Sequence, residues 1–105
     1  MFHVYILKCA DGSYYTGMTE NLEYRLAQHQ AGTFEDGYTS SRRPVELMWS
    51  AQFASHDDAF RRERQIKGWS RAKKEALIRG DWDGIRKVIQ QEHERREAKK
   101  DQPGS

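Results

Sequence analysis

The stretch FHVYILKCADGSYYTGMT, residues 2–19, decides the fold of this chain. Aromatic and β-branched side chains dominate residues 2–8 and 14–19, as is typical of β-strands. The Asp-Gly dipeptide at positions 11–12 lies between them and is a common hairpin turn. The sequence therefore predicts an antiparallel hairpin at the start of the chain.

The length of the turn decides which side chains share a face of the hairpin. A three-residue turn with Gly12 in the left-handed region pairs Leu7 with Tyr15 and Tyr5 with Gly17. Tyr5 and Tyr15 then lie on one face as diagonal neighbours, whereas a two-residue turn would place them on opposite faces. We expect the three-residue turn.

The rest of the chain is expected to form one more strand and four helices. Residues 45–53, VELMWSAQF, alternate apolar and polar side chains with period two, which predicts a strand. Capping residues and glycines predict helices over residues 19–30, 57–68 and 71–79, and a fourth helix after Asp81. The first cap is expected at Thr19 or Glu20, and the buried side of the fourth helix at Trp82, Ile85, Val88 and Ile89. The order β-β-α-β-α-α-α predicts an α/β (α+β) fold, a small three-stranded mixed or antiparallel sheet flanked by helices.

A chain of 105 residues is expected to form one domain. We place that domain at residues 1–90. Apolar periodicity ends near residue 91, so residues 91–105 are predicted to be a solvated helical extension followed by a disordered tail.

Composition and charge limit the compartment and the partner. The single cysteine, Cys9, excludes an internal disulfide and fits a reducing compartment. The chain shows neither a long apolar run nor a basic leader, so we expect a cytoplasmic protein. Residues 42–79 carry ten basic and five acidic side chains, a net charge of +5. This segment suits a polyanionic partner, although solvated helix faces would explain much of the same charge.

Glu63 is the most informative charged residue. It falls within the predicted apolar stripe of its helix, near Ala59, Phe60 and Ile66. A buried carboxylate without a partner is costly, so it needs a cation. A salt bridge to Arg25 is one interpretation, and a site for Mg²⁺, which often uses one or two carboxylates, is the other.

Four further side chains could act together with Glu63. Arg25 could bind a phosphate, and His29, one helical turn later, could carry a proton near neutral pH. Taken alone, Tyr5 and Tyr15 would be core aromatics, and the arginine and histidine would be ordinary helix residues. Combined on one face, these groups suffice for metal-assisted phosphodiester hydrolysis. Cys9 and the histidines show no zinc-ligand spacing, and no glycine-rich phosphate loop is present.

Several of these segments resemble the GIY-YIG nuclease superfamily, most closely its small single-domain bacterial members. The signature tripeptides correspond to residues 3–5 (HVY) and 15–17 (YTG). Residues 21–26 resemble the helix with the family arginine, and residues 59–69 resemble the segment with the metal-binding glutamate. Residues 38–45 match a loop of the small members, and the similarity covers about residues 2–80. His3 and Thr16 replace the name-giving glycine and isoleucine, and Met18 stands where the repair excinucleases have a lysine.

The resemblance implies a divalent-metal-dependent endonuclease that hydrolyses DNA phosphodiester bonds, in DNA repair or processing. Glu63 would hold one Mg²⁺ or Mn²⁺, and Arg25 would stabilise the transition state. Tyr5 or Tyr15 would deprotonate the attacking water, assisted by His29, which resembles a histidine of some restriction enzymes in the superfamily. Contacts to DNA phosphates are expected from Arg42, Arg43, Lys67, Arg71, Lys73 and Lys74.

Two other functions remain open at this point. The same fold could be a nucleic-acid-binding module with little or no turnover. A protein-interaction domain that uses Trp49, Trp69 or Trp82 is a third reading, which an exposed apolar patch would support. The sequence leaves open which DNA is bound, whether branched, single-stranded or duplex, and the oligomeric state.

Overall fold

The computed structural model describes residues 1–32 and 38–100. The chain divides into two compact units, Met1–Gly68 and Trp69–Ser105, and each is described by itself. The boundary near residue 90 that the sequence suggests stays a prediction. The predicted disordered tail, residues 101–105, lies outside the described residues.

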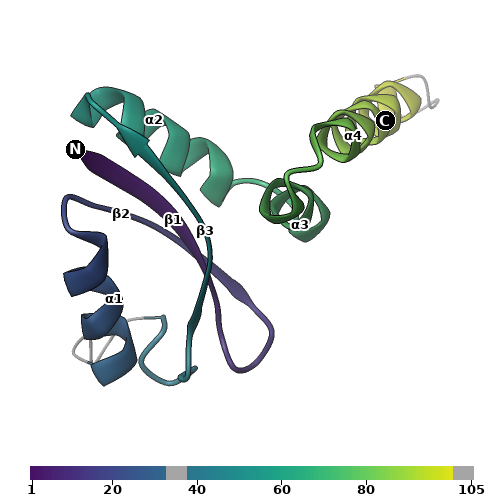
Figure 1. The fold of residues 1–105 in the computed structure, drawn as a ribbon. Helices are drawn as coiled ribbons and strands as arrows, with labels where there is room; N and C mark the ends of the chain where they lie inside the picture. Colours follow the sequence, from purple (N-terminus) through teal and green to yellow (C-terminus); the bar gives the residue numbers. More distant parts are fainter. Residues whose placement is uncertain (33–37, 101–105) are drawn as a thin grey trace. The chain divides into compact units, whose positions relative to one another are not determined.

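The first unit is a three-stranded antiparallel sheet with two helices (Figure 1). Its strands are β1 (Phe2–Lys8), β2 (Tyr14–Thr19) and β3 (Glu46–Phe53), in the order β2-β1-β3. Its helices are α1 (Leu22–Ala31) and α2 (His56–Lys67). The second unit contains α3 (Arg71–Arg79) and α4 (Trp82–Lys100). The α+β class and the element order agree with the expectation, and of the two predicted sheet types the antiparallel one is found.

The hairpin has the predicted three-residue turn. Tyr5 pairs with Gly17 and Leu7 pairs with Tyr15. Gly12 has a φ of 85°, a left-handed conformation that glycine adopts without strain. Both tyrosines of the signature tripeptides therefore lie on the same face of the sheet.

The uninterrupted alternation expected for β3 is wrong. Ile6 of β1 pairs with Trp49 but its neighbour Leu7 pairs with Leu47, so a bulge leaves Met48 without a partner on β1. A bulge shifts the side chains beyond it to the other face. Leu47 and Trp49 consequently lie on opposite faces, and Leu47 is 37% exposed.

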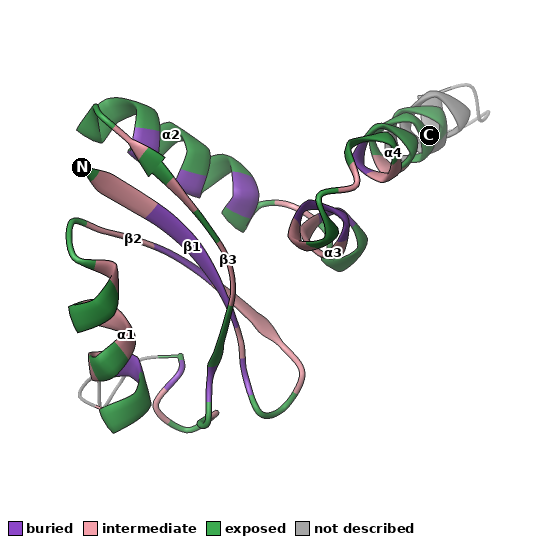
Figure 2. Ribbon diagram, in the orientation of Figure 1, coloured by how far each residue is buried: buried purple, intermediate pink, exposed green. Residues whose placement is uncertain are grey.

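The core of the first unit lies on both faces of β1, which is buried along most of its length (Figure 2). One cluster consists of Tyr5, Leu7, Cys9 and Val45, and Leu22 and Leu26 of α1 pack against it. Burial raises the pKa of the Cys9 thiol, so this cysteine is a core residue and no activated nucleophile. Val4 and Ile6 are fully buried, and α2 contacts all three strands.

The helix ends follow local capping rules with one correction. The cap of α1 is Asn21, whose side chain accepts a hydrogen bond from Tyr24 N (3.1 Å), so the expected start at residue 19 is wrong. Thr19 instead hydrogen-bonds Asn21 and forms part of the turn that leads into the helix. Ser55 is the N-cap of α2. Phe60, which the sequence placed in the buried stripe, is 46% exposed and stacks on His56.

In the second unit, α3 has its predicted bounds, with Ser70 as its N-cap and Gly80 at its end. The buried side expected for α4 is only partly right. Ile85 is buried, but Trp82 is 62% and Ile89 48% exposed. The helix α3 packs against α4 and covers only a narrow stripe of it, so the outer apolar positions Trp82 and Ile89 stay in solvent. Within the described residues, no helix has the length and apolar character needed to cross a membrane.

Candidate active site

A buried chain of three polar side chains links the hairpin, α1 and the loop before β3. The Tyr5 hydroxyl lies 2.9 Å from Nε2 of His29. Nδ1 of the same histidine lies 2.8 Å from the Thr39 hydroxyl oxygen. The three side chains are 1–3% exposed, so the hydrogen bonds lie out of solvent. Both ring nitrogens of His29 are thereby satisfied.

Tyr15 packs against this hydrogen-bonded chain, and Tyr38 packs against Tyr15. The Tyr15 ring centroid lies 5.1 Å from that of His29 and 6.3 Å from that of Tyr5. The Tyr15 ring also stacks with the Tyr38 ring, at a centroid distance of 6.2 Å. The two tyrosines and the histidine predicted from the sequence are therefore brought together by the structure.

Gly17 provides the room for the Tyr5 hydroxyl. A Cβ atom at position 17 would lie 2.5 Å from both Cζ and Oη of Tyr5. Real Cβ atoms do not approach other atoms this closely, and both residues lie inside the sheet. The cross-strand pair Tyr5–Gly17 therefore requires glycine for its close approach.

Glu63 is buried, as the sequence predicts, with 8% of its surface exposed. Its Oε1 accepts a hydrogen bond from Lys67 Nζ at 3.0 Å, one turn along α2. The Lys67 side chain is 55% exposed. The carboxylate thus has a cationic partner from its own helix, which the sequence reading did not anticipate.

Arg25 and Glu63 both act electrostatically on the buried phenol of Tyr5. Burial raises the pKa of Tyr5 above its usual range, the neighbouring Tyr15 and the Glu63 carboxylate raise it further, and Arg25 opposes them. Tyr5 is therefore a neutral phenol at neutral pH. Burial also lowers the pKa of His29, and the Arg25 charge adds to this effect. The imidazole is accordingly neutral at neutral pH and can accept a proton.

The residues predicted to contact DNA already have partners within the protein. Arg42 pairs with Asp11 (3.0 Å), and Arg43 donates to the backbone oxygens of Ser40 (3.0 Å) and Gln30 (3.3 Å). Lys67 pairs with Glu63, Arg71 pairs with Glu75 (2.8 Å), and the Lys73 ammonium lies 5.3 Å from the Trp69 ring centroid. Lys74 is half-buried on α3. Their contacts with phosphate stay a prediction.

The sequence reading missed two residues of this site, Tyr38 and Thr39. Both lie in the loop that leads to β3, and neither belongs to a helical or strand periodicity. The only signal was their place in the segment that resembles the small family members. Their partners, Tyr15 and His29, lie ten or more residues away, a pairing that only the folded chain reveals.

The first 76 residues match the GIY-YIG catalytic domain. A UPF0213 protein of Halobacterium salinarum is 51% identical over 80 residues, which cover 74% of this chain and all of that relative. A UPF0213 protein of Staphylococcus haemolyticus is 49% identical over 72% of this chain and 92% of that relative. The solution NMR structure of the UPF0213 protein BH0048 from Bacillus halodurans is 42% identical, with a TM-score of 0.49 over 74% of this chain and 83% of that one.

The chain therefore belongs to the GIY-YIG family, as a small member related to the UPF0213 proteins. Its fold is of the nuclease type, and domains of this family are typically endonucleases that act on nucleic acid and depend on a divalent metal.

The donor set around Glu63 fits one class of metal ion. The described residues contain no cluster of three or more His, Cys, Asp or Glu side chains that could hold a metal. Zinc sites need three or four protein ligands, so a zinc centre does not fit. Magnesium commonly takes one or two carboxylates and completes its shell with water and substrate phosphate. A single buried carboxylate, Glu63, fits this second pattern.

Proposed function

We propose that this protein is a divalent-metal-dependent endonuclease that hydrolyses phosphodiester bonds in DNA. The observation that carries the proposal is the hydrogen bond between Tyr5 and His29, which lies beside Tyr15 and within the electrostatic reach of Arg25 and Glu63. A neutral phenol joined to a neutral imidazole can move a proton without either group being charged at rest. If this region only packed the hydrophobic core, it would need neither His29 nor the charges of Arg25 and Glu63.

The Tyr5–His29 pair supplies the general base of this proposal. A water molecule attacks the phosphorus atom, and the bond between phosphorus and the leaving oxygen breaks with its electron pair on that oxygen. The water gives its proton to the Tyr5 oxygen, while Tyr5 passes its own proton to Nε2 of His29. This relay avoids a free phenolate, which the burial of Tyr5 disfavours. Tyr15 packs against both rings and orients them.

The remaining charged groups act on the phosphate. Arg25 stabilises the extra negative charge of the transition state. Glu63 would hold Mg²⁺ or Mn²⁺, and such an ion, when bound, polarises the phosphate and stabilises the leaving oxygen. Lys67 is the cation with which a metal at Glu63 has to compete. Since the site offers one carboxylate, we expect metal binding to be weak until a DNA phosphate adds a ligand.

Basic residues of α2 and α3 would bind DNA without reading its sequence. Lys74, together with Lys67, Arg71 and Lys73, would contribute through the phosphate backbone. We assign Arg42 and Arg43 a further role in the structure of the loop, because their guanidinium groups already hydrogen-bond within the protein. A role in DNA repair or processing, in the cytoplasm, is the setting that we propose for this activity.

The proposal is tested by incubating the purified protein with duplex, single-stranded and branched DNA, with Mg²⁺, with Mn²⁺ and with a chelator. We expect metal-dependent cleavage of at least one of these substrates. Binding without cleavage under every condition would favour the alternative, a nucleic-acid-binding module of the same fold.

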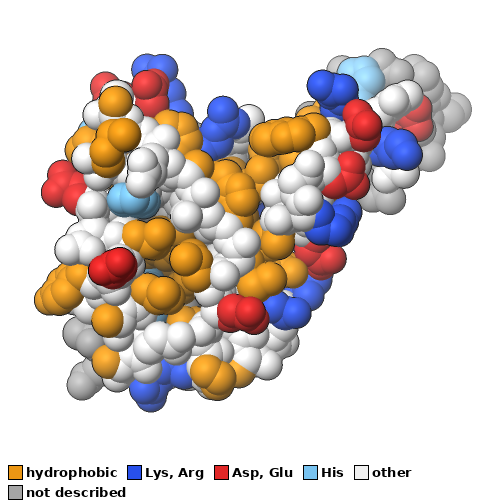
Figure 3. All heavy atoms as spheres, in the orientation of Figure 1, with side chains coloured by type: hydrophobic (Ala, Val, Ile, Leu, Met, Phe, Trp, Pro, Cys, Tyr) orange, Lys and Arg blue, Asp and Glu red, His pale blue; other side chains and the backbone are white. Residues whose placement is uncertain are grey.

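A protein-interaction domain is a weaker candidate. Several hydrophobic side chains lie on the surface of the first unit (Figure 3), and Leu47 and Phe60 are exposed there. Trp82 of the second unit is also exposed. None of these residues explains why a histidine is buried between two hydroxyl groups, so nuclease activity remains the better account of the site.

A further inference from the structure

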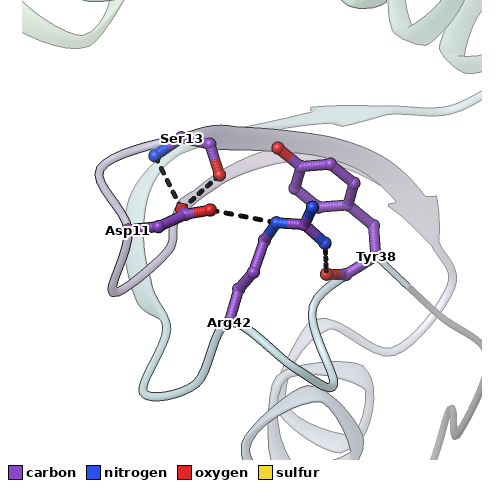
Figure 4. Close-up of polar contacts among 4 residues, drawn as sticks. All are labelled: Asp11, Ser13, Tyr38 and Arg42. Atoms are coloured by element: carbon purple, nitrogen blue, oxygen red, sulfur yellow. Dashed lines mark hydrogen bonds and ion pairs between the residues drawn. The ribbon is translucent and has the colours of Figure 1, made fainter.

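Arg42 connects the loop before β3, residues 38–45, to the turn of the hairpin (Figure 4). Arg42 Nε donates to Asp11 Oδ2 at 3.0 Å, and Arg42 Nη1 donates to the Tyr38 backbone oxygen at 2.7 Å. The same guanidinium lies 3.9 Å from the centroid of the Tyr38 ring. One side chain thus joins the turn, the loop backbone and an aromatic ring.

Asp11 is itself held in place by the turn. Its Oδ1 accepts hydrogen bonds from Ser13 N (3.0 Å) and Ser13 Oγ (2.5 Å). These bonds lower the pKa of Asp11, and Arg42 contributes to the same effect, so the carboxylate is charged at neutral pH. The backbone adds a further link, because Ala10 N donates to the Arg42 oxygen at 2.9 Å.

The same loop contributes two side chains to the site. Tyr38 stacks on Tyr15, and Thr39 hydrogen-bonds Nδ1 of His29. The Arg42 N–H donates to the Thr39 backbone oxygen at 3.0 Å, which connects Thr39 directly to the arginine. The placement of Thr39 therefore depends on the contact between Asp11 and Arg42.

Two tautomers of neutral His29 satisfy its two hydrogen bonds, and only one supports proton transfer from Tyr5. If Nδ1 carries the hydrogen, it donates to Thr39, and Nε2 accepts from the Tyr5 hydroxyl. In the other tautomer, Nε2 donates to Tyr5 and Thr39 donates to Nδ1. A phenol is a much stronger hydrogen-bond donor than an aliphatic hydroxyl because it is far more acidic, which favours the first arrangement.

We propose that Thr39 is a positioning residue, which holds His29 in the tautomer that accepts a proton from Tyr5. The Asp11–Arg42 pair fixes Thr39 in that position. The catalytic meaning of this arrangement rests on the proposed nuclease function, but the tautomer itself is a property of the free protein.

The test is the tautomer of His29 in the ¹⁵N-labelled full chain, read from long-range ¹H–¹⁵N spectra at neutral pH. A His29→Gln variant assigns the signal among the four histidines. We expect the Nδ1–H form in the wild type and in Thr39→Ser, which keeps the hydroxyl. Thr39→Val removes the acceptor and should populate the Nε2–H form. An Nε2–H wild type, or an unchanged tautomer in Thr39→Val, would overturn the proposal.

Cleavage kinetics supply the second readout. Thr39→Val should lower kcat by about tenfold or more, with KM little changed, and Thr39→Ser should restore it. If the protein has no nuclease activity, the tautomer of His29 still shows whether Thr39 positions the ring. Failure of the proposed nuclease function can therefore be distinguished from failure of the proposed role of Thr39.

A milder variant tests the fixing of the loop even if Thr39→Val does not fold. Asp11→Asn keeps an oxygen for Ser13 but removes the charge that faces Arg42. We expect faster solvent exchange of the His29 Nδ1 proton in this variant. Asp83→Asn is the matched control, because Asp83 pairs with Arg86 (3.3 Å) on the surface of α4. Equal exchange rates in Asp11→Asn and the wild type would mean that the pair does not position Thr39.

Discussion

The hydroxyl of Tyr5 lies 2.9 Å from Nε2 of His29, and both side chains are buried. Burial raises the pKa of the phenol and lowers that of the imidazole, so both groups are neutral at pH 7. The pair is thus set to move a proton between two neutral groups. The pH dependence of cleavage follows from this relationship.

The first prediction concerns that pH dependence. A protonated His29 cannot accept a proton, and its pKa lies below the ordinary value of about 6.5. Single-turnover cleavage should therefore be nearly constant from about pH 7 to 9 and fall only in acid, below the ordinary histidine range. A rate that rises steadily towards the tyrosine pKa of about 10 would instead indicate a phenolate base.

The second prediction tests the close approach of the two strands. A Cβ atom in Gly17→Ala would lie 2.5 Å from the Tyr5 oxygen, so the ring has to move away from His29. We expect a loss of stability of about 1–3 kcal/mol from overpacking, and at least a tenfold slower cleavage. Gly68→Ala is the control, because its nearest neighbour would lie at 3.7 Å. Equal melting temperatures and rates for the two variants would contradict the assigned role of Gly17.

The third prediction concerns Thr16, which stands where the family name has isoleucine. In the described part of the chain its buried hydroxyl oxygen has no hydrogen-bond partner. Thr16→Val has nearly the same shape and removes this polar group, so the protein should gain about 1 kcal/mol of stability. Thr19→Val is the comparison, because the Thr19 hydroxyl accepts a hydrogen bond from Asn21 N at 3.1 Å, and this change should lower the melting temperature. A destabilised Thr16→Val would show that the hydroxyl has a partner in solution.

The fourth prediction separates binding from chemistry. Lys74→Ala should weaken the binding of all duplex sequences alike and lower the slope of log K against log salt by about 0.9. Arg25→Ala should change this slope by no more than about 0.9, the contribution of one phosphate contact. The same variant should slow cleavage at saturating DNA by orders of magnitude. Binding titrations at several salt concentrations and single-turnover rates measure the two effects. Equal losses of affinity and of cleavage rate in the two variants would indicate that Arg25 only binds a DNA phosphate.

Much of the site follows from local rules that the sequence displays. The left-handed Gly12 determines the turn, and the turn determines that Tyr5 and Tyr15 share a face. Arg25 and His29 share a helix face because they are four residues apart, and the spacing of Ala59, Glu63 and Ile66 predicts the buried stripe of α2.

The features that the sequence does not predict depend on contacts between distant segments. The bulge at Met48 arises from pairing with β1, and it redirects Leu47 in a way that the alternation cannot show. Thr39 hydrogen-bonds His29, and Arg42 of the same loop pairs with Asp11 across 31 positions. Glu63 pairs with Lys67, which is exposed at i+4, whereas the two partners considered from the sequence were Arg25 and Mg²⁺. Periodicity reports which face a residue occupies but does not choose between possible partners on that face.

The most direct test of the account is the cleavage and binding of DNA by Glu63→Gln in the presence of Mg²⁺ or Mn²⁺. The amide keeps the shape of the carboxylate, and the lost ion pair involves a half-exposed lysine, so the melting temperature should change little. Glu75→Gln, which breaks the similar i,i+4 pair with Arg71, is the control. We predict that Glu63→Gln abolishes cleavage and retains DNA affinity, while Glu75→Gln cleaves normally. Cleavage by Glu63→Gln at the wild-type rate would contradict the assignment of Glu63 as the metal ligand and, with it, the proposed mechanism.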